Sequence, residues 1–80
     1  MSIRSTILDQ FEKVAREQAK QLAALTDQTP LLATGLDSLC FAIIVARLED
    51  ALGLDPFARA DERFPVTFGD FVRFYENAAQ

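Results

Sequence analysis

The stretch LATGLDSLCFAIIVARLED, residues 32–50, places a short polar segment directly before an apolar run. Gly35 permits a tight or left-handed turn, and Asp37 belongs to the residue types that cap helix N-termini. Gly53 stands where a C-terminal cap is expected. The pattern therefore predicts a helix over residues 38–52, with Ser38 in its first turn.

Three more helices are predicted around this one. Apolar residues recur every three or four positions over residues 2–25, which is typical of an amphipathic helix with its charged side chains, Lys20 among them, turned mostly to water. Ser2 is its expected N-cap, and Pro30 disfavours helical geometry just after it. A capping-box pattern starts another helix over residues 67–78. Asp and Pro in succession predict a short helix over residues 55–62.

The predicted fold class is all-α, because no segment has the alternation of a strand. We expect a small four-helix bundle with three long helices and one short one, forming a single domain over residues 1–80. On the helix of residues 38–52, a spacing of 100° per residue puts five side chains on a core face. These are Phe41, Ile44, Val45, Leu48 and Leu52. The Phe-rich stretch of Phe64, Phe68, Phe71 and Phe74 is also expected in the core, with Phe74 at the edge of the apolar face and partly exposed.

Charge and composition exclude several classes of function. The formal net charge is −4, and the acids are concentrated after residue 25. This balance disfavours binding to nucleic acid or to an anionic membrane and favours basic protein partners. No apolar run is long enough to span a bilayer, no targeting segment is recognisable, and the single cysteine fits a reducing cytoplasm.

The residues that catalysis normally requires are missing. The chain has no histidine, no metal-ligand spacing and no glycine-rich phosphate loop. Ser38 has no recognisable base to activate it as a nucleophile. Cys40 is expected to be a small apolar filler. The sequence therefore predicts a protein that is not an enzyme and holds no metal.

Two interpretations of Asp37 and Ser38 follow from the residues alone. In the first, they only cap a helix, and the protein is a small helical domain for protein–protein interaction. In the second, Ser38 is the target of another enzyme, since a phosphodiester there lies at the positive end of a helix dipole. Asp37 then binds a metal or basic group of the modifying enzyme, and the chain needs no base of its own.

A family resemblance favours the second interpretation. GLDSL, residues 35–39, resembles the phosphopantetheine-attachment motif of acyl carrier proteins, and residues 38–55 and 64–75 resemble helices of that family. The resemblance implies 4′-phosphopantetheine, derived from coenzyme A, on Ser38, with Asp37 as a motif residue that the transferase recognises. It implies a cytoplasmic carrier of acyl groups, with a carrier of aminoacyl groups as a close variant. Its implied partners are a phosphopantetheinyl transferase, a loading ligase or synthase and acyl-processing enzymes. We expect a monomer.

The outward face of the helix over residues 38–52 is unusually apolar for such a carrier. Acyl carriers of fatty acid synthesis typically have acids where this chain has Cys40 and Ile43. Either a neighbouring segment covers this face, or it is a docking patch, which we favour. The patch residues are Leu39, Ala42, Ile43, Ala46 and Arg47. Such a patch favours a specialised lipid or polyketide-like pathway over the housekeeping fatty acid synthase.

Overall fold

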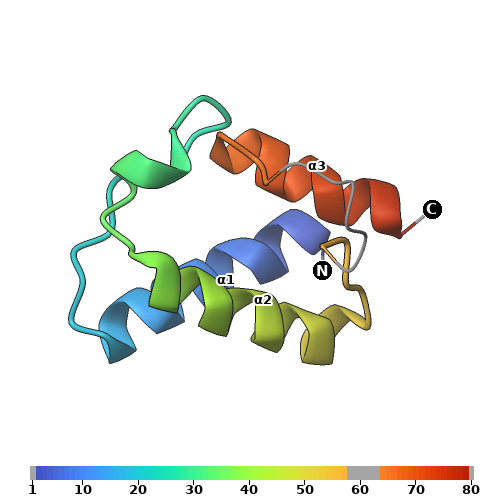
Figure 1. Ribbon diagram of the computed structural model, residues 1–80, viewed down its shortest axis with the longest axis horizontal. Helices are drawn as coiled ribbons and strands as arrows, with labels where there is room; N and C mark the ends of the chain where they lie inside the picture. Colours follow the sequence, from blue (N-terminus) through green and yellow to red (C-terminus); the bar gives the residue numbers. More distant parts are fainter. Residues whose placement is uncertain (1, 58–63, 80) are drawn as a thin grey trace.

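The computed structural model describes residues 2–57 and 64–79, and within them the regular structure is helical (Figure 1). Three α-helices, α1 (Ile3–Glu17), α2 (Ser38–Leu52) and α3 (Phe68–Ala78), are joined by loops that include a short 3₁₀ helix, η1 (Leu31–Ala33). The all-α class is confirmed. Pro56 and Phe57 form a turn, and the rest of the short helix predicted over residues 55–62 lies outside the described residues. The fourth helix therefore stays a prediction.

All three α-helices begin at the predicted cap residues, which are Ser2, Asp37 and Thr67. The side chain of Asp37 accepts a hydrogen bond from the Cys40 amide, and Gly53 ends α2 in the left-handed region at φ 69°. Thr67 and Asp70 form both hydrogen bonds of a capping box at the start of α3. Each cap satisfies backbone groups that the helix ends leave unpaired, which fixes these boundaries.

Helix α1 is shorter than predicted, because it ends at Glu17 and not near residue 25. Ala19 adopts a left-handed conformation at φ 56°. The Ala19 amide donates to the Arg16 carbonyl at 3.2 Å, and the Lys20 amide donates to the Ala15 carbonyl at 2.8 Å. This pair of hydrogen bonds is a Schellman motif, which normally has glycine at its left-handed position. Alanine favours helices, so the sequence contains no stop signal there.

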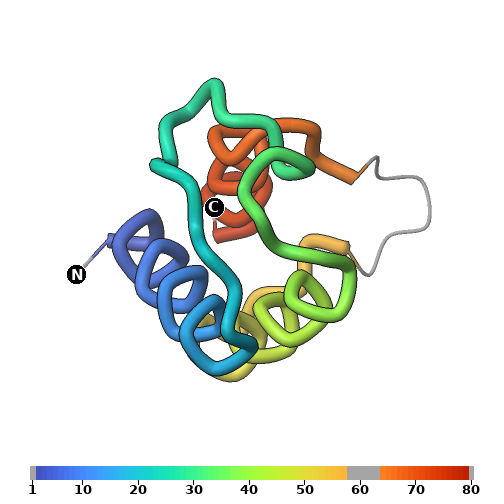
Figure 2. Tube along the Cα trace, turned by 90° about the vertical axis from the view of Figure 1, so that its left-hand side faces the viewer, coloured from blue at the N-terminus to red at the C-terminus, as the bar shows by residue number. Residues whose placement is uncertain are grey.

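Residues 18–30, which we call the strap, run from the end of α1 along the molecule to the start of α3 (Figures 1 and 2). Asp27 connects the strap to α1 and α3. The Asp27 carboxylate lies 2.8 Å from Arg4 Nη2, and the Asp27 carbonyl accepts a hydrogen bond from the Gly69 amide. Leu22 and Leu25 pack against the core from the strap. These two leucines have the spacing of a helix in the sequence, but they reach the core from a non-helical segment.

The three helices surround one core, seen end-on in Figure 2. α1 packs against both α2 and α3. The Phe11 side chain of α1 is fully buried, with ring centroids 6.1 Å from Phe41 of α2 and 5.2 and 5.4 Å from Phe68 and Phe71 of α3. Phe11 therefore joins all three helices. No helix within the described ranges is long and apolar enough to cross a membrane.

The predicted core face of α2 is confirmed for Phe41, Ile44 and Leu48, which are buried. Cys40 is also buried, in agreement with its expected role as a filler. Val45 and Leu52 are only partly buried and pack against the core. The prediction that the four phenylalanines of the C-terminal part are core is correct for two, Phe68 and Phe71. It is wrong for Phe64, whose side chain is 56% exposed, whereas Phe74 is partly buried, as expected for the edge of the apolar face.

Candidate functional site

Asp37 and Ser38 divide two tasks at the start of α2. Asp37 Oδ1 accepts a hydrogen bond from the Cys40 amide at 3.0 Å, so the aspartate is the cap. Ser38 is exposed, and its hydroxyl has no hydrogen-bond partner within residues 2–57 and 64–79. The Ser38 hydroxyl is therefore not needed for the helix and is accessible to another molecule.

The Asp37 carboxylate is held in its ionised form. Its hydrogen bond from the Cys40 amide is the main reason that its pKa falls from 3.8 to about 2, and the Lys20 ammonium also contributes. A hydrogen bond or opposite charge that favours the ionised form lowers the pKa of a carboxyl group. Asp37 is therefore negatively charged throughout the physiological pH range.

This lowered pKa predicts a loss of stability in acid. Because the folded state binds the Asp37 proton more weakly than the unfolded state, its contribution is complete above about pH 4. It is lost as the pH falls towards 2. In Asp37→Asn, which retains a good cap residue, we expect a weaker dependence of the unfolding midpoint on pH between pH 5 and 2. Thermal melts across that range measure it, and identical acid profiles for variant and wild type contradict the prediction.

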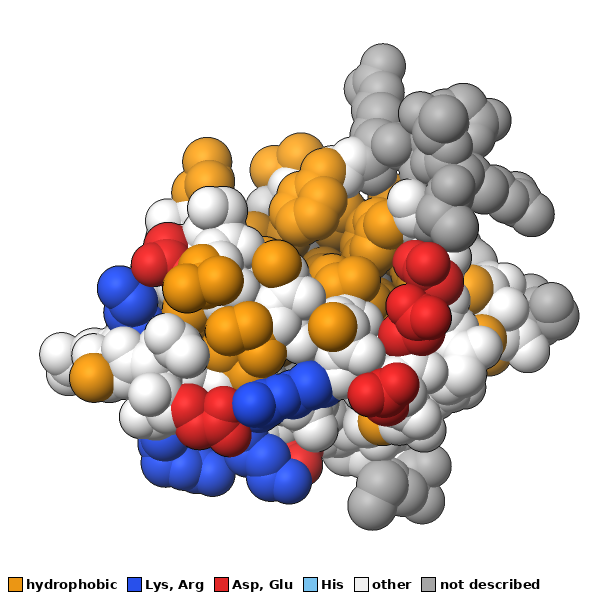
Figure 3. Space-filling view, turned by 60° about the horizontal axis from the view of Figure 1, so that its bottom comes forward, with side chains coloured by type: hydrophobic (Ala, Val, Ile, Leu, Met, Phe, Trp, Pro, Cys, Tyr) orange, Lys and Arg blue, Asp and Glu red, His pale blue; other side chains and the backbone are white. Residues whose placement is uncertain are grey.

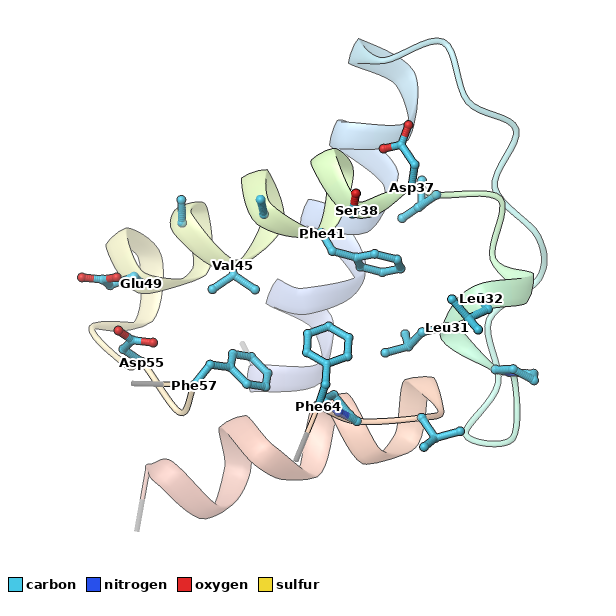
Figure 4. A pocket seen from close by; sticks show the side chains of 16 residues that line it. Leu31, Leu32, Asp37, Ser38, Phe41, Val45, Glu49, Asp55, Phe57 and Phe64 are labelled. Carbon is cyan, nitrogen blue, oxygen red and sulfur yellow. The ribbon is translucent and has the colours of Figure 1, made fainter. Parts of the chain in front are cut away.

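An apolar groove of about 870 Å³ opens beside Ser38 (Figures 3 and 4). Its walls come from α2, from the segment around η1 and from residues 55–57 and 64–66. Most of the side chains that line it are apolar, including Leu31, Leu36, Phe41, Val45, Phe57 and Phe64. The sequence did not predict this groove, since its walls come from loops as well as from α2.

The two ends of the groove differ in chemistry. Asp37 and Ser38 lie at one end, and Glu49 and Asp55 lie at the other, with Val45 between them along α2 (Figure 4). The rise of α2 from residue 38 to residue 49 is about 16 Å. The Ser38 hydroxyl points away from the ring of Phe64. A flexible group attached to Ser38 must therefore bend to enter the groove.

The five predicted docking residues do not form one uniform patch. Ala42 and Ala46 line the groove. Leu39 is 59% exposed, whereas Ile43 is partly buried and packs against the core. Figure 3 shows apolar side chains spread over this side of the molecule, with charged groups along their edges. Leu39, Ala42 and Ala46 are exposed on this face, and its role in docking stays a prediction.

Arg47, the fifth predicted docking residue, is engaged within the protein. Its guanidinium donates two hydrogen bonds to the Glu17 carboxylate of α1, at 3.0 and 2.6 Å. This contact lowers the pKa of Glu17 and raises the pKa of Arg47. The pair connects the end of α1 to the middle of α2. Arg47 therefore borders the apolar face as part of a neutral pair.

The site fits a covalently attached group better than a bound metal. Ser38 supplies an exposed hydroxyl at a helix start, where the amides of Ser38 and Leu39 have no acceptor inside α2. In the part of the chain that the structure describes, no three His, Cys, Asp or Glu side chains gather as a metal site. The chemistry at the start of α2 is thus one hydroxyl and one carboxylate beside an apolar groove, with Glu49 and Asp55 at the far end of that groove.

The family model described as "Phosphopantetheine attachment site" matches residues 5–60 of the chain. This match includes α2, with Asp37 and Ser38 at its start, and most of α1. No curated protein and no solved structure matches the chain.

Proposed function

Since the chain belongs to the phosphopantetheine-attachment family, to which 4′-phosphopantetheine is bound covalently, we propose that it is a discrete acyl carrier protein loaded at Ser38. When attached, this group supplies a terminal thiol that holds an acyl chain as a thioester. The observation that carries the proposal is the exposed Ser38 hydroxyl. This hydroxyl is not needed as the helix cap, because Asp37 accepts the hydrogen bond from the Cys40 amide.

The chain's own residues supply recognition and no catalysis. Ser38 Oγ attacks the coenzyme A phosphorus that carries the pantetheine. The new O–P bond forms as the pyrophosphate P–O bond breaks, and adenosine 3′,5′-bisphosphate leaves. The serine proton passes to a base of the transferase, since this chain supplies no histidine. The ionised carboxylate of Asp37 offers a ligand to a metal ion or basic group of that enzyme. A loading ligase or synthase and acyl-processing enzymes are then the further partners.

The test is loading followed by intact mass measurement. We expect the purified protein, incubated with coenzyme A and a broad-specificity phosphopantetheinyl transferase, to gain the mass of one phosphopantetheinyl group. Ser38→Ala is expected to gain nothing yet to keep its stability to within about 0.5 kcal/mol, because Asp37 is the cap. Wild-type protein that stays unmodified with several transferases supports the alternative, a helical interaction domain in which Ser38 has no cargo.

The groove supports an acyl cargo over an uncharged polar one. Its lining is dominated by aliphatic and aromatic side chains, and each buried methylene of a ligand contributes about 0.8 kcal/mol. Its mouth is bordered by exposed apolar residues, among them Leu32, Phe64 and Val66. A specialised lipid or polyketide-like pathway is the proposed setting, because the positions where fatty acid synthesis carriers typically have acids hold Cys40, which is buried, and Ile43, which packs against the core.

We propose Leu39, Ala42, Ile43, Ala46 and Arg47 as the face that partners contact. Leu39 is the best probe, because it is exposed and adjoins Ser38. We expect Leu39→Glu to raise the KM of the transferase for the carrier by about tenfold, which corresponds to one buried apolar contact.

Leu32→Glu is the matched control for this variant. Leu32 is 96% exposed and lies on η1, across the groove from α2. Steady-state loading kinetics of both variants measure the difference. Equal KM values for Leu39→Glu and Leu32→Glu remove the docking role of Leu39.

A further inference from the structure

The strap places a cation beside the attachment serine. Lys20 Nζ lies 3.2 Å from Asp37 Oδ2, and Asp37 directly precedes Ser38. In Figure 4 the Ser38 hydroxyl and the Asp37 carboxylate point to the same side of α2, away from the groove. The Lys20 ammonium, which contacts that carboxylate, is therefore on the side where the Ser38 hydroxyl is open to modification.

The backbone holds Lys20 in this place. Its amide donates to the Ala15 carbonyl in the Schellman motif that ends α1. The backbone of the following residue, Gln21, lies close to Gly35, since a Cβ added to Gly35 would be 2.4 Å from the Gln21 carbonyl oxygen. Two residues further, the Ala23 amide donates to the Thr34 carbonyl at 3.0 Å. The start of the strap is thus joined to the loop that precedes Ser38.

Loading changes the charge at this point. A phosphodiester is an anion, and on Ser38 it adds a negative charge next to the ionised Asp37 carboxylate. Like charges at neighbouring residues repel, and the repulsion raises the free energy of the loaded state. The Lys20 ammonium has three donors, and its contact with Asp37 needs one of them. The remaining donors are available to a second anion.

We propose that Lys20 is a positioning residue for the phosphopantetheine arm, with its ammonium bridging the Asp37 carboxylate and the phosphodiester on Ser38. The first atoms of the arm are then held towards the strap, on the side of α2 opposite the groove. The proposal rests on the proposed attachment at Ser38. It gives a function to a lysine whose sequence position, in the predicted helix of residues 2–25, indicated only a solvent-facing charge.

The test compares apo and loaded forms of four proteins: wild type, Lys20→Gln, Lys20→Arg and Lys13→Gln. Lys13 is the matched control, because it forms an ion pair of similar length with Asp9, at 3.1 Å, within α1. Intact mass first establishes that one group is attached. Thermal melts at low ionic strength then give the change in midpoint on loading, and phosphorus NMR gives the resonance of the phosphodiester.

We expect loading to lower the midpoint of Lys20→Gln by about 2–4 °C more than that of wild type, as the loss of one exposed ion pair implies. Lys20→Arg and Lys13→Gln should behave like wild type, and Lys20→Gln alone should shift the phosphorus resonance. Salt at about 1 M should remove the difference in midpoint. Equal changes in Lys20→Gln and Lys13→Gln, with an unmoved resonance, overturn the role of Lys20. Absence of any mass gain in wild type overturns instead the attachment at Ser38.

Discussion

Replacing Gly35 by alanine is expected to lower the free energy of unfolding by about 2–6 kcal/mol, the sum of two separate costs. Gly35 has a φ of +93°, which residues with a side chain rarely adopt. An added Cβ would lie 2.4 Å from the Gln21 carbonyl oxygen. That oxygen belongs to backbone and has little freedom to move. A domain of this length has about 4–12 kcal/mol of total stability, so the variant is expected to be largely unfolded or close to it.

Gly53→Ala is the matched control for this substitution. Gly53 is also left-handed, at φ +69°, but an added Cβ would meet no atom within 4 Å. Only the conformational cost remains, about 1 kcal/mol. Denaturant unfolding of both variants measures the difference. Equal losses in the two proteins mean that the contact between the strap and the Gly35 loop is not tight in solution.

The second large effect is expected from Phe11→Ala, at about 3–5 kcal/mol. Phe11 is fully buried and forms edge-on ring contacts with Phe41, Phe68 and Phe71. Truncation removes contacts with both other helices at once and leaves a cavity that rigid neighbours cannot fill. We expect the variant to lose its cooperative thermal transition while it keeps part of its helical circular dichroism.

Phe64→Ala removes the same side chain from a different environment. The Phe64 ring is 56% exposed at the groove mouth, although it also stacks on Phe57 at 5.6 Å. We expect a loss below about 1.5 kcal/mol, the value of an aromatic pair. A loss for Phe64→Ala as large as that for Phe11→Ala contradicts the assignment of Phe11 as the central residue of the core.

The parts of the fold that the sequence predicts are those with local chemical signals. The ends of α2 and the start of α3 follow from Asp37, Gly53 and Thr67, whose side chains or backbone freedom satisfy helix ends directly. The end of α1 has no such signal. Ala19 takes a left-handed conformation because the strap must reach the Gly35 loop and the start of α3, and this tertiary requirement outweighs the helix propensity of alanine.

The same distinction applies to the site. Ser38 and Asp37 are recognisable because they are neighbours in one motif, and the family match includes them. The groove and Lys20 are not recognisable in this way. The groove needs loops that are distant in sequence, and Lys20 is 17 residues before Asp37 in the chain. The periodicity of the sequence places Lys20 on the surface of a helix. That periodicity contains no information about the left-handed residue at Ala19, where the helix ends.

α1 packs against both α2 and α3. We therefore expect that the space between α2 and the residues before α3 can widen while both α1 interfaces stay in place. The described residues place one aromatic pair across the groove, Phe41 and Phe64, with ring centroids 6.4 Å apart. Separating such a pair costs about 0.5–1.5 kcal/mol. One or two newly buried methylene groups offset that cost. For the acyl cargo proposed above, chain length is therefore expected to be a weak barrier, and we expect selection among cargoes to depend on the enzymes that load and unload the protein.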